Sequence, residues 1–503
     1  MTGQLRNQIL LGIDLGTTVL KLCAFDGRSG AILGQAARRL PVALSPNGGR
    51  EQSLASVDRA FRAIVGELKR QVGTAWRQIE GVGLAAQGGS SIIVNRADGK
   101  PLTSMILWND GRTHAYTARV AERAPKRIWR DKLLCDAPPA GLGRLLWLKE
   151  TRPELFQAEN LHVGAGEYLF FRLTGVWRQD AGNAVQIGSY NAAAQKLDSA
   201  FFRLIDLPLS FVAPLRKGHE TAPLSKPGAR LLGLAEGIPV AGPYIDQETG
   251  YLSTVGVCER PLQCSLGTAW VGNFILPGKT NGFSPTQIVL PSPVGKGRLV
   301  IQPLLTGNTV WDWGLAHLLD AKRERALALA EKVFAESLTP PDGLVALPWF
   351  AQPSPLFPQA HGGGLFFGLH AQTDRADQLR ALAAGMVCEF ARVFTEVKSS
   401  EAVDGVVLGG GASKGSYFRR WLAALFSPLP VFWQIDEDLS AARGAVFAFS
   451  PKAARGRVRR VEKISAALLS AIQNHYDQYR RVFEKFYSSI PVGQAFSFAG
   501  RKK

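Results

Sequence analysis

The sequence predicts an α/β protein with at least two domains, and three observations support this fold class. The chain has 503 residues, too many for one hydrophobic core. Residues 9–25 contain two apolar runs that flank a tight polar turn, a pattern that favours two strands joined by a hairpin. In the second half, a buried-strand pattern over 405–408 leads into a glycine-rich turn and then a helical pattern.

The turn within 9–25 reads Asp14-Leu15-Gly16-Thr17-Thr18 and carries the groups that a phosphate loop needs. Gly16 permits close backbone approach, so N–H groups can face an anion. Thr17 and Thr18 add hydroxyl donors, and Lys21 adds a positive charge. Asp14 stands at the tip of a buried strand, where a carboxylate packs poorly but can hold hydrated Mg²⁺. We interpret this turn as a phosphate loop, with an ordinary polar hairpin turn as the alternative.

The other elements of the first half follow from the spacing of apolar residues. In order, we expect a strand over 31–39, a helix over 57–72, strands over 82–86 and 91–95 around the turn Gln87-Gly88-Gly89-Ser90, and helices over 142–149 and 164–173. A short strand should end at Gly242, before Pro243 and the segment that contains Asp246 and Gln247.

The pattern of strands and glycine turns restarts near Cys258, where we place a domain boundary. A strand over 262–266 precedes Gly267-Thr268, a second phosphate-like turn. A glycine- and proline-rich loop over 348–364, a helix over 379–397, the strand over 405–408, a helix over 417–425 and a strand over 431–433 follow. The turn Gly409–Ser413 lets a flat ligand such as a purine lie against backbone without a Cβ in the way. A tight strand-to-helix turn is the alternative reading.

Composition limits the class of protein. A hydrophobic content of 46% with 20% charged residues is ordinary for a globular protein, and no apolar run is long enough to predict a membrane span. The N-terminus leads into the first strand without the pattern of a signal peptide. The five cysteines are odd in number and form no Cys-x-x-Cys pair, which favours reduced thiols and a cytoplasmic protein.

Charge is concentrated at the C-terminus. The formal net charge is +18, and half of it lies in residues 451–503, where twelve Lys and Arg stand against three acidic residues. Such a segment can contact nucleic acid or anionic lipid, but a solvated basic face is the simpler explanation, so we expect neither nucleic acid nor membrane as a partner. From Ile464 onward, large apolar residues recur every three or four positions, which predicts an amphipathic helix packed on the protein.

Taken together, these motifs resemble the FGGY carbohydrate kinases of the actin/Hsp70/sugar-kinase superfamily, with most likeness to kinases of the xylulose and ribulose type. The resemblance runs in order from about residue 9 to about residue 448. It is carried by Gly12–Thr18 with Lys21, Ile106–Thr113, Leu145–Glu150, Tyr168-Leu169, Arg172–Gly175, Asp246-Gln247, Gly267-Thr268, Gly307-Asn308, Gly409–Lys414 and Arg443–Ala445.

The resemblance implies two ribonuclease-H-like (actin-like ATPase) domains with a cleft between them. Residues 1–257 would form the sugar-binding domain, 258–450 the nucleotide-binding domain, and 451–503 a basic C-terminal helix. It implies an enzyme that phosphorylates a ketose, such as a pentulose, or a polyol with ATP and Mg²⁺. Oligomeric state stays open, a homodimer included.

The resemblance also implies roles for single residues. Asp246 would be the general base, and Asp14 would hold Mg²⁺, through water. Phosphate and nucleotide would be bound by Gly16, Thr17, Thr18, Lys21, Gly267, Thr268, Gly410, Gly411, Ala412 and Ser413. The sugar would contact Gln87, Trp108, Asn109, Asp246 and Gln247. From the residues alone, Asp246 reads equally well as a helix N-cap, and Trp108 as a core aromatic.

Departures from the family pattern indicate a divergent member. The sugar loop of the first domain corresponds to residues 86–90 of this chain. In xylulose kinases, Met-His-Gly usually follows the glutamine of this loop, whereas Gly88-Gly89-Ser90 follows Gln87 here. The Arg-Glu pair of glycerol kinases is absent as well. The two glycines predict a pocket opened for a larger or differently shaped sugar. Ala351-Gln352-Pro353 replaces a Gly-Glu-Arg element of the second domain. A non-catalytic binding relative with a basic docking tail is therefore the alternative to a kinase.

Overall fold

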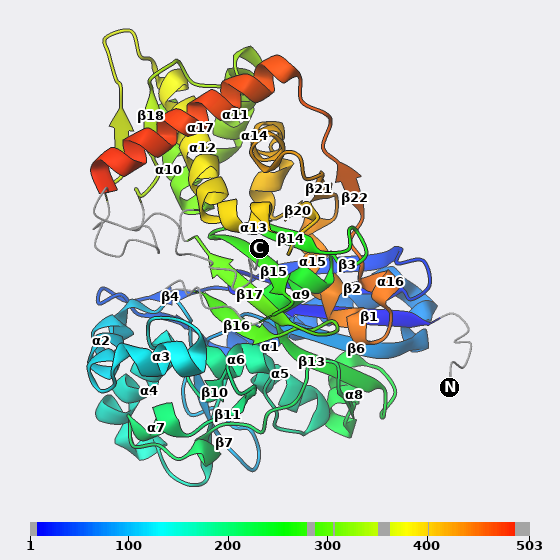
Figure 1. Cartoon of the computed structure of the whole chain (residues 1–503). Helices are drawn as coiled ribbons and strands as arrows, with labels where there is room; N and C mark the ends of the chain where they lie inside the picture. The colour runs from blue at the N-terminus through cyan, green and yellow to red at the C-terminus, as the bar shows by residue number, and fades with distance from the viewer. Residues whose placement is uncertain (1–7, 279–286, 305–306, 351–362, 401, 488–503) are drawn as a thin grey trace. The chain divides into compact units, whose positions relative to one another are not determined.

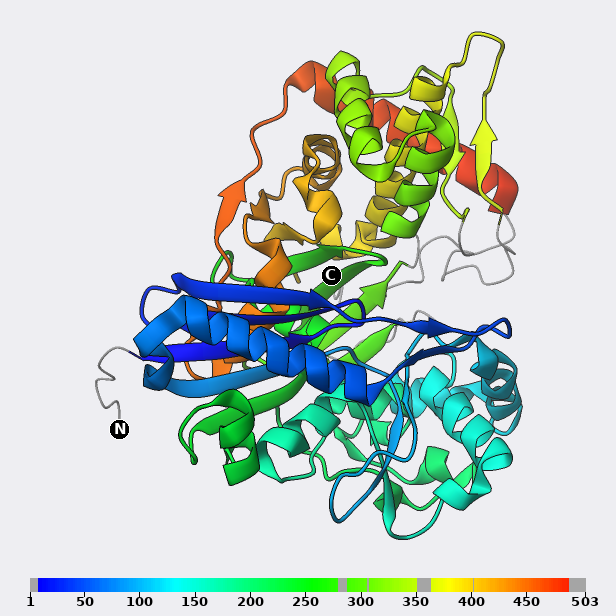
Figure 2. The ribbon, with the colours of Figure 1, turned by 180° about the vertical axis from the view of Figure 1, so that it is seen from behind.

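A computed structural model describes residues 8–278, 287–304, 307–350, 363–400 and 402–487 (Figures 1 and 2). The chain divides into two compact units. Unit 1 comprises 1–255, 288–299 and 439–456, and unit 2 comprises 256–287, 300–438 and 457–503. The first change of unit falls two residues before the predicted boundary at 257/258. Residues 439–456 group with unit 1, although the sequence assigned most of them to the second domain.

Unit 1 is built on a six-stranded sheet in the order β12-β13-β6-β1-β2-β3. The predicted hairpin is confirmed, because β1 and β2 pair antiparallel along their whole length, and β3 continues the meander. The strands β6 and β13 add to the other side of β1, and the three run parallel. The bounds are β1 Ile9–Leu15, β2 Val19–Asp26, β3 Ile32–Arg39, β6 Ile79–Ala86, β12 Thr221–Pro223 and β13 Pro239–Ile245.

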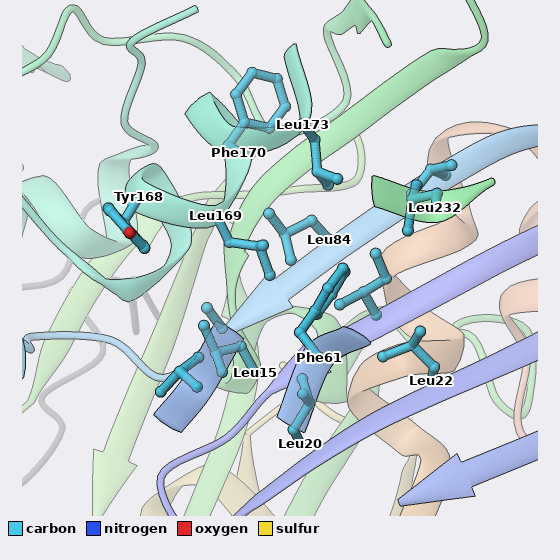
Figure 3. Packing of buried hydrophobic residues seen from close by; sticks show 14 of the residues in the cluster. Leu15, Leu20, Leu22, Phe61, Leu84, Tyr168, Leu169, Phe170, Leu173 and Leu232 are labelled. Atoms are coloured by element: carbon cyan, nitrogen blue, oxygen red, sulfur yellow. The ribbon is translucent and has the colours of Figure 1, made fainter. Parts of the chain in front are cut away.

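Both faces of β1 are covered, which explains why every residue of this strand is buried and most are apolar. Ile9, Leu11, Ile13 and Leu15 alternate onto the face covered by α1 (Leu54–Val72), α5 (Ala165–Thr174) and α8 (Lys226–Leu232). Figure 2 shows α1 lying across this face of the sheet. Figure 3 shows Phe61 of α1 surrounded by Leu20, Leu22 and Leu84 of the strands, with Leu169 and Leu173 of α5 beyond them.

The opposite face of the sheet is covered by the returning segment with α15 (Ser440–Ala445). Two glycines of the sheet make this approach close. A Cβ on Gly12 would stand 2.1 Å from the backbone oxygen of Ala442, and one on Gly83 2.1 Å from that of Ala445. Leu10 and Asp14 lie on the same face of β1 as Gly12, since side chains alternate along a strand. This packing explains why residues 439–456 belong to unit 1.

The rest of unit 1 consists of short elements around the sheet. They are β4 Ala43–Leu44, β5 Arg50–Gln52, β7 Ile92–Asn95, β8 Met105–Ile106, α2 His114–Glu122, α3 Lys126–Leu133, α4 Ala140–Thr151, β9 Asn160–Val163, α6 Ala181–Gln186, β10 Tyr190–Asn191, β11 Lys196–Leu197, α7 Ala200–Arg203, α9 Asp246–Leu252, β16 Ile288–Pro291 and α16 Pro451–Ala454.

The second sheet has the order β16-β17-β15-β14-β20-β21-β22, and β15, β14, β20, β21 and β22 lie wholly in unit 2. β14 and β20 are parallel neighbours, and β14 and β15 form an antiparallel hairpin. The bounds are β14 Pro261–Leu266, β15 Trp270–Leu276, β17 Arg298–Pro303, β18 Val345–Leu347, β19 Leu365–Phe367, β20 Gly405–Gly409, β21 Val431–Gln434, β22 Val458–Arg460, α10 Asn308–Leu319, α11 Arg323–Glu336, α12 Arg375–Val393, α13 Thr395–Ser399, α14 Ser416–Phe426 and α17 Ala466–Tyr487.

The predicted C-terminal helix is confirmed as α17, which lies along α12, α14 and β18 (Figure 1). Its apolar stripe is buried through Ile472, Tyr479, Val482 and Phe483, as the three- and four-residue spacing indicated. The cations Arg480, Arg481 and Lys485 are exposed. No helix in the described part of the chain is long and apolar enough to cross a membrane.

Several predicted elements extend a few residues beyond their predicted bounds, for example α1, β6 and α4, and two others need a correction with a physical reason. The strand expected to end at Gly242 continues through Pro243 to Ile245, with a shift of register between Ala241 and Tyr244 that absorbs the Gly-Pro pair. The helix expected over 379–397 begins earlier, at Arg375, because Asp374 and Asp377 form a capping box, and it ends at Val393. Residues 351–353 lie outside the described residues.

Candidate active site

Asp14 occupies the buried end of β1, beside the turn to β2. It is paired across the hairpin with Lys21, whose Nζ lies 3.9 Å from Asp14 Oδ2. Oδ1 of Asp14 is buried and has no hydrogen-bond partner among the residues that the structure describes. Burial raises the pKa of Asp14, and the charge of Lys21 opposes this. An orphaned carboxylate oxygen at a strand end is a free ligand atom for a hard cation.

The turn after Asp14 is joined to the predicted sugar loop by a chain of hydrogen bonds. Thr17 Oγ1 donates to Oε1 of Gln87 at 2.9 Å and accepts from the indole N–H of Trp108 at 3.1 Å. Gln87 is 3% exposed, and its Oε1 also accepts from Ser90 Oγ at 3.0 Å. Thr17 and Gln87 are thus held by protein groups, whereas Thr18 is exposed and Gly16 is half-buried.

Trp108 is 41% exposed, so the alternative reading of this residue as a core aromatic is wrong. Its neighbour Asn109 is half-buried, and Asn109 Oδ1 has no hydrogen-bond partner among the described residues. Both side chains therefore have polar or aromatic surface available for a ligand beside the sugar loop.

Asp246 is the first residue of α9, and Ile245 occupies the N-cap position. The alternative reading of Asp246 as the N-cap is therefore wrong. Its Oδ1 accepts a hydrogen bond from the backbone N–H of Gln247 at 2.9 Å. Burial and the negative charge of Asp14 raise the pKa of Asp246 to about 7, and Lys21 lowers it. A half-buried carboxyl with such a pKa can accept a proton near neutral pH.

Sheet register explains why these two carboxylates meet. Asp14 of β1 stands opposite Ala85 of β6, and Ile245 of β13 stands opposite Ala86. Both acids thus lie at the carboxyl ends of parallel strands, Asp14 within β1 and Asp246 directly after β13, at the edge where ligands bind in open α/β sheets. The residues fit Mg²⁺, which binds through one or two carboxylates and keeps waters and phosphate oxygens as its other ligands. The described residues contain no cluster of three or more His, Cys, Asp or Glu suited to a metal.

A second set of acids lies beneath the site and was not predicted. Asp180, 3% exposed, caps α6 by accepting from the backbone N–H of Asn183 at 2.8 Å, and its Oδ2 accepts from that of Ile245 at 3.2 Å. Burial raises the pKa of Asp180 to about 6, and Glu248 is hydrogen-bonded to it. Burial raises the pKa of Glu167 to about 8. An aspartate before a short helix was the available sequence signal.

A cavity of about 10 Å³ lies between these acids and the sugar loop. Its lining includes Gln87, Glu167, Asp180 and Tyr244. Glu167 Oε1 and the Tyr244 hydroxyl are buried without hydrogen-bond partners among the described residues. This volume holds about one water molecule, and the polar lining suits one.

The glycines of the sugar loop do not leave open space. A Cβ on Gly88 would stand 2.2 Å from Nε2 of Gln186, and one on Gly89 2.7 Å from its Oε1. The prediction of a pocket opened by these glycines is therefore wrong, because a side chain from α6 fills the volume.

In unit 2, the two predicted glycine turns lie side by side. Gly410 has φ +83°, and a Cβ there would stand 2.6 Å from the backbone carbon of Leu266, directly before Gly267-Thr268. Asn308 links the region, because its Nδ2 donates to the oxygen of Leu266 at 3.3 Å and its backbone N–H to that of Gly267 at 3.0 Å. The sequence assigned Asn308 no role in the site.

The side chains around these turns leave polar groups for a ligand. Thr268 is exposed, and a Cβ at Gly411 would stand 3.7 Å from Nδ2 of Asn308, an ordinary contact distance. Ala412 is 7% exposed. Ser413 Oγ is buried without a hydrogen-bond partner among the described residues. Such a surface suits phosphate oxygens and a flat ring.

Comparison with known proteins agrees with this geometry. The FGGY family of carbohydrate kinases matches through its N-terminal domain over residues 9–253 and its C-terminal domain over residues 286–449. A glycerol kinase of Alkalilimnicola ehrlichii is 25% identical over 461 residues, 88% of this chain and 90% of that protein. The L-xylulose/3-keto-L-gulonate kinase of Escherichia coli is 27% identical over 396 residues, 76% of this chain and 75% of that protein.

Solved structures show the same fold. The xylulose kinase of Rhodospirillum rubrum superposes with a TM-score of 0.83 at 19% identity, over 96% of this chain and all of that one. The predicted two-domain, actin-like ATPase fold is thus confirmed. The chain belongs to the FGGY family of carbohydrate kinases and is a sugar or polyol kinase.

Proposed function

We propose that this kinase transfers the γ-phosphoryl group of ATP to a hydroxyl of a ketose, such as a pentulose, or of a polyol, with Asp246 as the general base. Sugar kinases of this family use ATP. The observation that carries the proposal is the half-buried carboxyl of Asp246, whose pKa burial and Asp14 raise to about 7. A base with this pKa accepts a proton at neutral pH and also releases it for the next turnover.

The proton and phosphoryl balance is simple. The acceptor hydroxyl loses its proton to the Asp246 carboxylate as its oxygen forms the new bond to γ-phosphorus. The bond from γ-phosphorus to the bridging oxygen breaks, and ADP leaves with that electron pair. Little covalent chemistry is left for the protein, so positioning and charge supply most of the rate enhancement.

Phosphate positioning falls to the turns. On unit 1, the exposed Thr18 hydroxyl, the backbone at Gly16 and the charge of Lys21 would contact phosphate oxygens. Thr17 is engaged with Gln87 and Trp108, so it supports the turn rather than offering a free hydroxyl. Asp14, with its orphaned Oδ1, would hold Mg²⁺, which neutralises phosphate charge when bound. On unit 2, the nucleotide would contact Gly267, Thr268, Gly410, Gly411, Ala412 and Ser413.

The acceptor would lie near Asp246, Gln247, Trp108 and Asn109. Gln87 is buried and bonded, so it orients the turn at Thr17 instead of contacting the sugar directly. The relatives include proteins named glycerol kinase and L-xylulose/3-keto-L-gulonate kinase, so glycerol, L-xylulose and 3-keto-L-gulonate belong in the test. We favour a ketose or a polyol larger than glycerol, because the Arg-Glu pair typical of glycerol kinases is absent from the loop after Gln87.

The test is an ADP-release assay of the purified protein with a panel of ketopentoses, 3-keto-L-gulonate, glycerol and longer polyols. We expect acceptor-dependent ADP release with at least one ketose or polyol. The rate of ADP release by Asp246→Asn should be at most about one hundredth of the wild-type rate. Asp206→Asn makes the same chemical change at a side chain that is 84% exposed and serves as the matched control. Full turnover by Asp246→Asn would overturn the assignment of the base.

A further inference from the structure

The side chain that faces the sugar loop comes from α6, not from the loop. Gly88 and Gly89 carry no side chains, and the amide of Gln186 occupies the space that both would have used. After Gln186, the next side chain near a Cβ at Gly89 is Trp108, whose own Cβ would stand 3.4 Å away. Gln186 therefore borders both glycines, and the exposed Trp108 borders Gly89.

Helix α6 is tied to both segments that carry the candidate acceptor residues. Asp180 accepts hydrogen bonds from the backbone N–H groups of Asn183 and Ile245, the latter directly before Asp246. Asn183 Oδ1 in turn accepts from the N–H of Gly89 at 3.1 Å. A Cβ at Gly182 would stand 2.8 Å from the Ile245 side chain, so the helix and the start of α9 are in close contact. These bonds fix the position of Gln186.

The Gln186 amide has hydrogen-bonding capacity left for a ligand. Its Nε2 donates to the backbone oxygen of Gly182 at 3.1 Å, which uses one of its two N–H groups. No donor among the described residues reaches its Oε1, and the residue is half-buried. An amide with one free N–H and a free carbonyl oxygen can pair with a hydroxyl as acceptor and as donor at once.

We propose that Gln186 is a specificity-determining residue that binds hydroxyl groups of the acceptor, in place of the side chains that Gly88 and Gly89 lack. The inference rests on the proposed function and deepens it, because it assigns acceptor selection to α6. A ligand with a pair of neighbouring hydroxyls matches the donor and acceptor of one amide.

The first experiment measures kcat and KM for the best acceptor and for the weaker acceptors of the panel in wild type, Gln186→Ala and Gln186→Leu. We expect KM for the best acceptor to rise about ten-fold, as for the loss of a ligand hydrogen bond. KM for ATP should stay within two-fold of the wild-type value. The ratio of kcat/KM between the best acceptor and the weaker acceptors should decrease. Gln71→Ala, which removes an exposed glutamine of α1, is the matched control. Unchanged acceptor KM values and preferences would overturn the proposal.

A second variant separates a role of Gln186 from damage to the fold. Gly88→Ala would place a methyl group where the Gln186 amide lies, and so displace that amide without deleting it. It should raise the acceptor KM as Gln186→Ala does, and the double variant should show no further rise, because one contact is lost in each case. Additive effects would contradict the proposal.

Thermal stabilisation by acceptor distinguishes failure of this inference from failure of the proposed function. If the wild type is stabilised by an acceptor but transfers no phosphoryl group, and Gln186→Ala loses that stabilisation, the proposed function fails and the role of Gln186 stands. If the wild type is active and Gln186→Ala matches it, only the inference fails. If no acceptor is bound, both fail.

Discussion

Asp14 and Asp246 lie close enough for the negative charge of Asp14 to raise the pKa of Asp246. They lie 232 positions apart in the chain, and the parallel strands β1, β6 and β13 bring them to one edge of a sheet. Lys21, opposite Asp14 in the hairpin, lowers the pKa of both. Burial is the largest cause of the raised pKa of the candidate base; one neighbouring anion adds to it, and one neighbouring cation opposes it.

Turnover by the wild type should depend on pH through Asp246. A general base acts only when deprotonated, so kcat/KM should fall as pH drops below about 7 and reach a plateau above it. The measurement is kcat/KM for the acceptor between pH 5 and 9 at saturating ATP. A flat profile across this range would contradict the assignment.

Substitutions of the two neighbours should move this midpoint in opposite directions. Asp14→Asn removes the anion that raises the pKa of Asp246, so the midpoint should shift to lower pH. Lys21→Met removes the cation that lowers it, so the midpoint should shift to higher pH. Both variants should turn over more slowly because of the lost phosphate or Mg²⁺ contacts. The midpoint of the pH profile of kcat/KM does not depend on the height of its plateau, so the shift can still be measured. Shifts of the same sign would show that the two carboxylates are not coupled in this way.

The sequence was informative where a local pattern carries the structure. The apolar run of β1, the helical period of α1 and the apolar stripe of α17 each predict buried residues, and the structure confirms these elements. Asp14 could be singled out because a carboxylate at the end of an apolar strand conflicts with packing alone.

The sequence was not informative where long-range contacts decide. Helix α6 has six residues, with Gly182 and Asn183 among them, and shows no apolar period. The position of Gln186 over Gly88 depends on a contact across about a hundred residues of chain. Likewise, the return of α15 to the sheet depends on how closely Gly12 and Gly83 allow it to approach.

Glu167 should make the protein less stable as pH rises. Burial raises its pKa from an ordinary 4.5 to about 8, so between these values the folded state holds a proton that the unfolded state has released. Stability then falls with rising pH, by about 1.4 kcal/mol for each pH unit in which one group differs in this way. Chemical denaturation at pH 5 and pH 8 measures the change in the free energy of unfolding between these pH values. This free energy should decrease less for Glu167→Gln than for wild type.

The matched control for that comparison is Glu80→Gln, an exposed residue of β6 that should keep the wild-type dependence on pH. A Glu167→Gln protein with the wild-type loss of stability between pH 5 and 8 would show that Glu167 is ionised in the folded state.

The C-terminal helix should contribute to the stability of the fold through its buried stripe. Phe483 is 1% exposed, and Cζ of Arg392 lies 4.1 Å from the centroid of its ring. The neighbouring Tyr479 hydroxyl donates a hydrogen bond to Glu389 Oε2 at 2.9 Å. Phe483→Ala should cost about 3–5 kcal/mol, as for other buried phenylalanines, whereas Phe486→Ala, at a side chain that is 49% exposed, should cost far less. Deletion of residues 461–503, which removes this buried stripe, should lower the melting temperature of the protein. A truncated protein that has the melting temperature of the wild type but no longer binds polyanions or anionic vesicles would show that the segment is a docking arm.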